Sequence, residues 1–429
     1  MIDKKKLRLN WIAVISGHFL ERYEVMTFSF FIPILTPLFF PMHDKRLVAL
    51  AGMATFAAGY WARPLGGLIF GHIGDRLGRR VALLGSILCV TVPTLILSFL
   101  PTYEKIGLIA PLILVFCRLI QGISVGGEYS GAAVYFYEYS STSKQGLSGG
   151  IMCATAFLGG VLGTLVGSIS TYSINSEWGW RLPFLIGGLA SLLSYAFRKY
   201  VIETPVFQAL EKKKQTYPFI KLLRTKRKQM LIAILVGSQG HILLYTITLY
   251  FNSIILKNHQ VSQFNIMALN TVILTIWVVL FVLFGILADK ISKKKILMGI
   301  FSGIIILSIP LLLLLNQNFS YANLALFEII FSIFGAGMFN LAASFLPSLF
   351  NPEERYSGVA VGQTIGQAIL GGSAPLIATF LSPWTGEILA PVALIFVSSF
   401  FGLLLIVKES NSENQLGIKI NEVEGCLIK

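Results

Sequence analysis

The chain has 429 residues, of which 55% are hydrophobic and 13% are charged. A soluble domain carries about 25% charged residues and could not bury this much apolar surface, so the composition excludes a soluble fold and indicates a protein of the lipid bilayer. The formal net charge of +14 is compatible with nucleic acid binding, but the placement of the basic residues argues against that partner.

Twelve apolar runs are each long enough to cross a bilayer as a helix, which takes about 20 residues. In chain order, the predicted spans are residues 11–39, 47–70, 80–100, 107–136, 146–172, 182–199, 229–256, 266–288, 295–315, 322–346, 357–381 and 388–407. Basic residues precede the first run, as in a signal peptide, but the run continues to Phe40 without a clear cleavage site, so we interpret it as a retained span. The sequence therefore predicts an all-α membrane protein of twelve transmembrane helices.

A lysine-rich polar stretch, residues 200–228, separates the predicted spans into two groups of six. This predicts an N-terminal six-helix bundle (1–199), a linker loop (200–228), a C-terminal six-helix bundle (229–407) and a tail (408–429). Within the linker, "ETPVFQALEKKK" has Pro205 near its start, where proline suits the first turn of a short surface helix. The tail has no sustained heptad, so no coiled coil is expected there.

The positions of lysine and arginine predict the orientation of the spans, because cytoplasmic loops carry an excess of basic residues. With the N-terminus in the cytoplasm, 26 of the 34 lysine and arginine residues fall on the cytoplasmic side and five on the other side. Three more, Arg22, Arg63 and Arg118, lie inside spans. The basic excess is therefore mainly a signal of topology, in contact with the lipid bilayer, and no nucleic acid partner is expected. We expect both termini in the cytoplasm and a multi-pass location in the inner (plasma) membrane.

Two loops at matching places in the two halves share a pattern. "FGHIGDRLGRR" (70–80) joins the second and third predicted spans, and "FGILADKISKKKI" (284–296) joins the eighth and ninth. Aligned without a gap, each has a glycine, an aspartate four residues later, a cation and further basic residues. Asp75 and Asp289 therefore occupy equivalent positions. Halves that repeat in the same orientation are one transporter architecture.

The first loop resembles the loop signature of the major facilitator superfamily. The chain resembles its metabolite:proton symporter branch in "RPLGGLIFGHIGDRLGRR" (63–80), "RLIQGISVGGEYSGAA" (118–133), "WGWRLPFLIGG" (178–188), "ETPVF" (203–207) and "ERYSGVAVGQTIGQAILGGSAPLIATFL" (354–381). That branch includes transporters of proline and betaine, 2-oxoglutarate, citrate and shikimate. The resemblance covers most of the chain, and it implies the major facilitator fold and transport driven by protons. It does not identify the substrate.

Charged side chains inside the predicted spans are candidate site residues, because a charge at the bilayer centre costs about 3 kcal/mol or more. His18, Glu21 and Glu24 are spaced by three in the first span, so they lie roughly on one helical face. Their depth places them near the midplane, and Arg118 in the fourth span is similarly deep. We expect a Glu–Arg pair at a central cavity, with Glu21 or Glu24 carrying the coupled proton. The alternative is that these charges only neutralise each other and hold helices together.

The resemblance implies a role for the same part of the first span. The family typically reads like "EWYD" or "EWFD" there, and this chain has Glu21-Arg22-Tyr23-Glu24. Glu21 and Tyr23 match, and Glu24 takes the place of aspartate. Arg22 replaces tryptophan, so it either adds a cation to the site or points sideways to another partner. The mixture of charges allows an anionic carboxylate, held partly by Arg118 with Arg22 as a further candidate, or a zwitterion such as proline or betaine.

A second charged group lies toward the cytoplasmic ends of the second and fourth spans and in the loop between the second and third. We expect Arg63, Asp75, Arg79 and Glu128 to form a gate network that holds while the cavity faces outward and breaks when it faces inward. The resemblance implies the same. Asp289 is the candidate gating residue of the repeated loop. The alternative is a static set of ion pairs that never breaks.

In the C-terminal half, the candidates are polar residues among apolar ones. His241 lies in the seventh span, which corresponds to the first span in the repeat, so it is a candidate for lining the site; ordinary hydrogen bonding is the alternative. Gln363 and Gln367 lie one turn apart in the eleventh span, and they either line the cavity or pack against the eighth span. Glu328 in the tenth span has no assigned role.

No motif of enzyme chemistry is present. The sequence has no "GxxxxGK[ST]", so ATP is not expected as the energy source, and its four cysteines show no spacing of a disulfide framework or metal site. We expect no cofactor, a functional monomer, and a symporter that uses the proton motive force to import a small polar organic metabolite by alternating access. The alternatives are a transporter-like membrane sensor and a passive facilitator without proton coupling.

Overall fold

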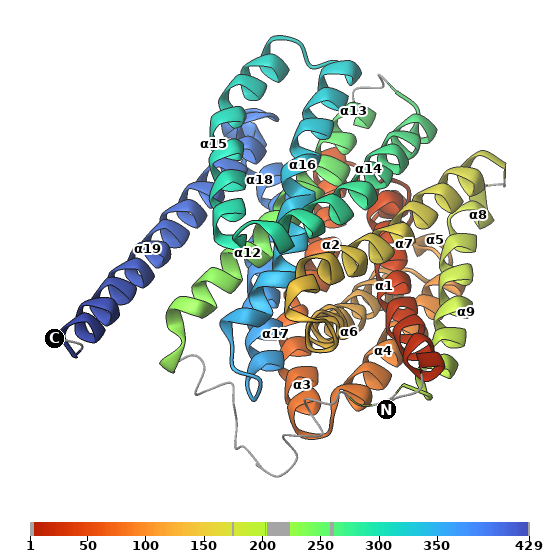
Figure 1. Cartoon of the computed structure of the whole chain (residues 1–429). Helices are drawn as coiled ribbons and strands as arrows, with labels where there is room; N and C mark the ends of the chain where they lie inside the picture. Colours follow the sequence, from red (N-terminus) through yellow and green to blue (C-terminus); the bar gives the residue numbers. More distant parts are fainter. Residues whose placement is uncertain (1–3, 174–175, 202, 204–223, 258–260, 428–429) are drawn as a thin grey trace.

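The computed structural model describes residues 4–173, 176–201, 203, 224–257 and 261–427, and the regular elements in these residues are all helical (Figure 1). The N-terminal half contains α1 (Lys4–Phe39), α2 (Lys45–Trp61), α3 (Arg63–Arg76), α4 (Arg79–Phe99), α5 (Tyr103–Ile106), α6 (Ile109–Tyr139), η1 (Thr142–Lys144), α7 (Gln145–Ser173), α8 (Ser176–Gly179) and α9 (Arg181–Arg198). The C-terminal half contains α12 (Arg227–Tyr245), η2 (Thr246–Phe251), α13 (Asn252–Lys257), α14 (Gln263–Lys290), α15 (Lys293–Gln317), α16 (Tyr321–Phe345), η3 (Leu346–Leu349), α17 (Arg355–Gly366), η4 (Gln367–Gly371), α18 (Ala374–Thr385) and α19 (Leu389–Leu427).

Helices cover all of the apolar runs that the sequence singles out. Within the described part of the chain, nine helices are long and apolar enough to cross a membrane. The other predicted spans, 11–39, 47–70 and 182–199, correspond to α1, to α2 with α3, and to α9. These helices are shorter or less apolar than the nine. α1 contains a cluster of charged residues, α2 and α3 are separated at Ala62, and α9 has an arginine at each end.

Three of the predicted spans are interrupted helices. The second turns at Ala62, and Pro64 stands in the first turn of α3, where its missing N–H is not needed for an intrahelical bond. The seventh and eleventh contain the π-helical segments η2 and η4. A π segment closes its hydrogen bonds over five residues instead of four, so it shifts which side chains share a face of the helix on either side of it.

The two halves meet along several long helices. α7 packs along α14, and α3 and α6 pack along α17. Glycines permit the close approach of α7 to its neighbours: a Cβ at Gly159 would lie 2.0 Å from the Phe19 carbonyl oxygen of α1, and one at Gly150 would lie 2.4 Å from the Phe281 carbonyl oxygen of α14. We name the two ends of the bundle after residues there. The Asp75 end carries the α3–α4 loop and the start of α17, and the Arg46 end carries the start of α2 and the end of α18.

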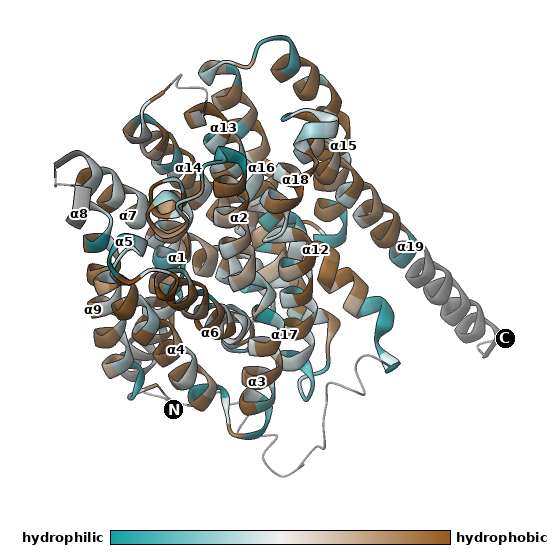
Figure 2. Ribbon diagram, turned by 180° about the vertical axis from the view of Figure 1, so that it is seen from behind, coloured by the Kyte–Doolittle hydropathy of each residue, from teal (hydrophilic) through white to brown (hydrophobic). Residues whose placement is uncertain are grey.

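Hydrophobic residues make up much of the helical ribbon in Figure 2, and many large apolar side chains are exposed on the outside of the bundle. Large exposed examples are Phe99, Leu112, Phe116, Ile306 and Trp384. Such a surface suits helices whose backbone groups are satisfied internally and whose side chains face lipid.

Part of the predicted linker cannot be compared with the structure. Residues 204–223, which include most of the predicted surface helix, lie outside the described residues, so that helix remains a prediction. At the other end, α19 continues beyond the predicted span 388–407 to Leu427, and Figure 1 shows it extending away from the other helices.

Candidate functional site

Glu24 and Arg118 form a buried ion pair between α1 and α6. The Arg118 Nη1 atom lies 3.2 Å from Glu24 Oε1. Gln121, one turn after Arg118, donates to the same carboxylate oxygen at 2.5 Å and accepts from Arg118 at 2.8 Å. The Phe28 ring centroid lies 4.0 Å from the guanidinium carbon. The structure therefore contains a central Glu–Arg pair, with Glu24 as its acid.

Glu21 contacts His18 instead. His18 Nδ1 lies 3.0 Å from Glu21 Oε2, and both side chains are buried. Glu21 Oε1 and His18 Nε2 have no hydrogen-bond partner in the described chain. Tyr23, which the family pattern placed with these residues, donates to the Pro183 carbonyl oxygen of α9 at 2.8 Å. In this arrangement Tyr23 therefore packs α1 against α9 and does not join the charged cluster.

Arg22, whose direction the sequence left open, adds a cation to the centre of the molecule. Its guanidinium carbon lies 4.8 Å from the ring centroid of Phe157 in α7 and 5.5 Å from that of Phe339 in α16. The two rings come from different halves, so Arg22 lies at the boundary between them.

His241 and Gln363 bring polar groups from the C-terminal half. The His241 ring centroid lies 4.5 Å from that of Phe339, and its Nδ1 lies 3.1 Å from the Gly237 carbonyl oxygen. Its Nε2 has no hydrogen-bond partner in the part of the chain that the structure describes. Gln363 of α17 is fully buried against Gly237, and neither polar atom of its amide has a partner among the described residues. Both residues therefore present unused hydrogen-bonding atoms in the interior.

A layer of contacts joins the halves near the centre. The Tyr60 hydroxyl of α2 donates to the Tyr245 hydroxyl of α12. Arg63 Nη1 donates to Gln367 Oε1 at 2.8 Å, and its guanidinium carbon lies 3.4 Å from the Tyr60 ring centroid. Arg63 was predicted to form a network with Asp75 and Glu128, and these partners are wrong. α3 begins at Arg63, directly after the turn at Ala62, and directs the Arg63 side chain to Gln367 of η4.

The prediction that Glu128 opposes Asp75 is also wrong, because Glu128 is bound inside the N-terminal half. Arg198 of α9 donates to Glu128 through Nη1 at 2.7 Å and through Nη2, and the Ser86 hydroxyl of α4 donates at 2.6 Å. Arg198 also donates to the carbonyl oxygens of Ala13, Val14 and Leu83. The count of basic residues places Arg198 among the loop cations, whereas the structure buries it completely.

Asp75, at the end of α3, contacts the first turn of α17 in the opposite half. Its Oδ2 accepts from the Ser357 backbone N–H at 3.2 Å and from the Ser357 hydroxyl at 2.5 Å. Its Oδ1 accepts from Arg79 Nη1 at 3.0 Å. We call Asp75, Arg79 and Ser357 the Asp75 contact. Asp75 lies outside the predicted spans, and burial raises the pKa of its carboxyl above the ordinary value, although Arg79 and Ser357 oppose this effect.

Asp289, the equivalent residue at the end of α14 in the C-terminal half, contacts a helix of the N-terminal half. Its two oxygens accept from the backbone N–H groups of Gly146 at 2.6 Å and Leu147 at 2.9 Å, in the first turn of α7. We call these residues the Asp289 contact. Each loop aspartate therefore holds the first turn of a helix in the other half, where the helix dipole favours a negative charge.

Glu138 of α6 adds ion pairs at the same end. Its carboxylate lies 3.3 Å from Arg355 Nη1 of α17 and 3.9 Å from Arg79 Nη2. The Tyr356 hydroxyl donates to the Gly127 carbonyl oxygen at 2.9 Å. The Asp75 end is therefore closed by several contacts between α3 or α6 and α17.

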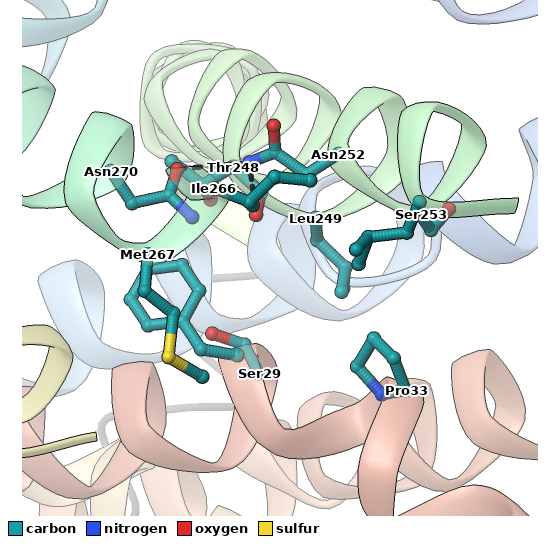
Figure 3. Close-up of a pocket in the computed structure, with 11 residues that line it drawn as sticks. Ser29, Pro33, Thr248, Leu249, Asn252, Ser253, Ile266, Met267 and Asn270 are labelled. Carbon is teal, nitrogen blue, oxygen red and sulfur yellow. Dashed lines mark hydrogen bonds between the residues drawn. The ribbon is translucent and has the colours of Figure 1, made fainter. Parts of the chain in front are cut away.

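The Arg46 end is hollow by comparison. A cavity of about 560 Å³ lies between α1 and α2 on one side and η2, α13 and α18 on the other, and its lining includes Lys45, Arg46, Tyr250 and Glu387. A small cavity of about 10 Å³ lies between α1, α13 and α14. Figure 3 shows Ser29 of α1 facing Asn252 and Asn270, which are hydrogen-bonded to each other at 2.9 Å.

Sequence reasoning missed the aromatic residues and the uncharged partners of the site. Phe157, Phe339, Tyr60 and Tyr245 stand in apolar runs, where nothing distinguishes an aromatic residue that meets a cation from one that faces lipid. Ser357 follows "ERY", and only its position at the start of a helix could have suggested its role. Among the described residues, no group of three His, Cys, Asp or Glu side chains is placed to hold a metal ion.

The fold and the site define a membrane transporter built from two halves around a polar interior. Residues 16–371 match the Major Facilitator Superfamily, and the chain belongs to this superfamily of transporters; it is not an enzyme. A relative from Staphylococcus aureus (strain COL), provisionally named a proline/betaine transporter, is 30% identical over 417 residues, which are 95% of this chain and 89% of the relative. The proline/betaine transporter of Escherichia coli (strain K12) is 28% identical over 438 residues, covering 97% of this chain and 86% of the relative.

Solved structures share the fold. The xylose transporter XylE from E. coli, in a partially occluded inward open conformation, matches with a TM-score of 0.75 at 16% identity and covers 94% of this chain and 98% of its own. The human organic anion transporter MFSD10 matches with a TM-score of 0.64 at 15% identity, with 93% and 99% covered. At these identities the likeness concerns the fold alone.

Proposed function

We propose that the protein is a proton-coupled symporter that imports a small polar organic metabolite, either a carboxylate or a zwitterion of the proline/betaine type. The observation that carries this proposal is the Glu24–Arg118 pair, a buried carboxylate and guanidinium whose Glu24 Oε2 and Arg118 Nε atoms have no hydrogen-bond partner in the described part of the chain. The names of the proline/betaine relatives support the substrate class, and the proton:xylose symporter among the structural neighbours supports proton coupling on this fold.

The proposal includes an orientation and a domain plan. The Asp75 end and both termini face the cytoplasm, and the protein crosses the inner (plasma) membrane twelve times. The bundles are 1–199 and 229–407, with a linker at 200–228 and a tail at 408–429. The excess of basic residues on one side supports this orientation. The functional unit is a monomer that works without a cofactor, on the proton motive force.

The contacts between the halves support alternating access. The described chain is closed at the Asp75 end and has a cavity of about 560 Å³ at the Arg46 end, which is the arrangement of a transporter sealed from the cytoplasm. Inward opening requires the Asp75 contact, the Asp289 contact and the Tyr60–Tyr245 hydrogen bond to break. Closure of the Arg46 end then shields the interior from the outside.

Glu24 carries the proton in this cycle. Ionised Glu24 holds Arg118 and Gln121 in place. A proton on Glu24 removes the negative charge that faces Arg118, so the pair loosens and α1 is freed from α6 at this depth. Loss of the proton on the opposite side restores the pair. Glu21, held by His18, is the second candidate for the same step.

Glutamine variants in proteoliposomes test this proposal, with radiolabelled L-proline, glycine betaine and 2-oxoglutarate as probes. Glutamine has the shape of the protonated acid but cannot release a proton. Glu24→Gln is therefore expected to lower accumulation driven by a pH gradient at least tenfold while exchange of labelled solute without a gradient continues. Glu104→Gln, at an exposed residue of α5, serves as the matched control and should accumulate solute normally.

Full accumulation by both Glu24→Gln and Glu21→Gln would show that neither acid carries the proton. A passive facilitator would equilibrate the solute without accumulating it, and a sensor would not move it. Accumulation that a protonophore abolishes separates the proposed symporter from both alternatives.

A further inference from the structure

Arg22 is a buried cation whose hydrogen-bond donors are unused. Of the arginines inside the predicted spans, Arg118 pairs with Glu24 and Arg63 donates to Gln367. Among the described residues, the Nε and Nη1 atoms of Arg22 have no hydrogen-bond partner, although the side chain is only 1% exposed. The adjacent carboxylate, Glu21, uses Oε2 to contact His18. The structure therefore holds a guanidinium in the interior without an anion bonded to it.

Aromatic rings hold Arg22 from both halves of the molecule. Phe157 belongs to the same half as Arg22, and Phe339 belongs to the other half. Cation–π contacts attract the guanidinium to the faces of the rings but satisfy none of its N–H donors. Since Phe339 moves with the C-terminal half, this contact exists only while the halves are together at this depth.

A buried guanidinium with unused donors is a strong site for a carboxylate. Taking N–H donors out of water without replacing their hydrogen bonds costs free energy, which a bound anion recovers. The planar group offers parallel donors that match the two oxygens of a carboxylate. The Phe339 ring that contacts Arg22 also contacts His241, whose Nε2 is without a partner, so a second polar group lies beside the same ring.

The charges at the centre agree with an anionic ligand group. With both acids ionised and the histidines neutral, Glu21 and Glu24 carry two negative charges and Arg22, Arg63 and Arg118 carry three positive charges, so one positive charge is in excess. A carboxylate neutralises this excess. If the solute is a zwitterion, the free Oε1 of Glu21 is available for its cationic group.

We propose that Arg22 binds the carboxylate group of the transported solute. The inference rests on the proposed transport function and deepens it, because it assigns recognition of the solute's carboxylate to one residue. It also separates two tasks: Arg22 recognises the solute, and the Glu24–Arg118 pair handles the proton. His241 and Gln363 meet the polar remainder of the solute from the C-terminal half.

A comparison of acids with their amides tests the proposal on the purified full-length protein. Dissociation constants are measured by calorimetry for L-proline, glycine betaine, 2-oxoglutarate and shikimate and for the primary amide of each. In the wild type, we expect the tightest-binding acid to bind about 10- to 100-fold better than its amide. Arg22→Gln should remove that preference by weakening the acid and leaving the amide unchanged. Arg227→Gln, at an exposed arginine that begins α12, is the matched control and should keep the preference.

The outcomes distinguish this inference from the transport proposal. A folded Arg22→Gln variant that prefers the acid as strongly as the wild type overturns the role of Arg22. If that variant does not fold, Arg22→Lys replaces it, because lysine keeps the charge but lacks the planar guanidinium. Arg22→Lys must then reduce the preference for the acid at least threefold, or the inference fails. Absence of any acid preference in the wild type also overturns it. Binding that requires Arg22, without accumulation in proteoliposomes, supports the inference and refutes symport.

Discussion

Asp75 and Asp289 occupy equivalent positions in the two halves, but their surroundings differ. Both accept hydrogen bonds from the first turn of a helix in the opposite half. Asp75 also pairs with Arg79, which lies 3.9 Å from Glu138, and Glu138 contacts Arg355 of α17. Asp289 is held by two backbone donors, and Lys293 of the same loop donates to the Ser344 carbonyl oxygen instead.

The difference follows from the type of cation in each loop. The first loop has arginines, whose planar fork can bridge Asp75, the Gly74 carbonyl oxygen and the neighbourhood of Glu138. The second loop has lysines, which act as point charges. The repeat therefore preserves the crossing contact of the aspartate, and in the described residues the first copy surrounds it with ion pairs among Arg79, Glu138 and Arg355. We expect the Asp75 contact to stabilise closure more than the Asp289 contact.

Removal of Asp75 is expected to have the largest effect. Asp75→Ala removes two hydrogen bonds to Ser357 and leaves Arg79 buried without its nearest carboxylate, which costs about 3 kcal/mol. The closed arrangement should lose stability accordingly. The readout is maleimide labelling of Ser344→Cys, a buried position on α16 beside Gly149 of α7, in a background without the native cysteines. We expect labelling to accelerate at least tenfold.

Removal of Asp289 is expected to have a smaller effect. Asp289→Ala removes two charge-assisted hydrogen bonds at a half-buried helix end, which costs about 1 kcal/mol, and the half-buried Lys293 keeps its hydrogen bond to the Ser344 carbonyl oxygen. Labelling of the same Ser344→Cys reporter should accelerate about fivefold. An acceleration equal to or larger than that of Asp75→Ala would show that the ion pairs around Asp75 do not make its contact the more stabilising one.

A change of pH is expected to have the smallest effect. Burial raises the pKa of the Asp75 carboxyl in the closed arrangement, so this arrangement binds a proton more tightly than an open one in which water surrounds the group. Closure is therefore favoured as the pH falls through the raised pKa, and the gain is complete below the ordinary value of 3.8. Between about pH 7.5 and 5.5, labelling normalised to denatured protein should slow by less than about threefold. Asp75→Ala should show no such dependence.

The helices were largely predictable from the sequence because a bilayer demands about 20 consecutive apolar residues. The run at 80–100 corresponds to α4 (Arg79–Phe99), for example, and the run at 322–346 corresponds to α16 (Tyr321–Phe345). The turn at Ala62 and the π segments η2 and η4 were not predictable in the same way. They depend on which backbone groups pair, and hydropathy carries no information about that pairing.

The members of the site were more predictable than their partners. Glu24 and Arg118 stand out because charges are costly inside a span, and counting residues from the span ends gives their depth. Counting gives neither the rotation of a helix about its axis nor the identity of its neighbours. Glu128 was therefore matched with Asp75, whereas α9 brings Arg198 to it, and Arg63 was matched with the same network, whereas η4 brings Gln367 to it.

The burial of Arg198 also bears on how the chain is assembled. Arg198 ends α9, the last helix of the N-terminal half, and its guanidinium binds Glu128 of α6 and carbonyl oxygens of α1 and α4. During synthesis, the earlier helices therefore hold an unpaired glutamate until α9 enters the membrane. The first half becomes complete at that moment, before any helix of the second half has entered the membrane. Substitution of Arg198 would accordingly lower the amount of protein in the membrane, and the molecules that do fold would transport at the normal rate.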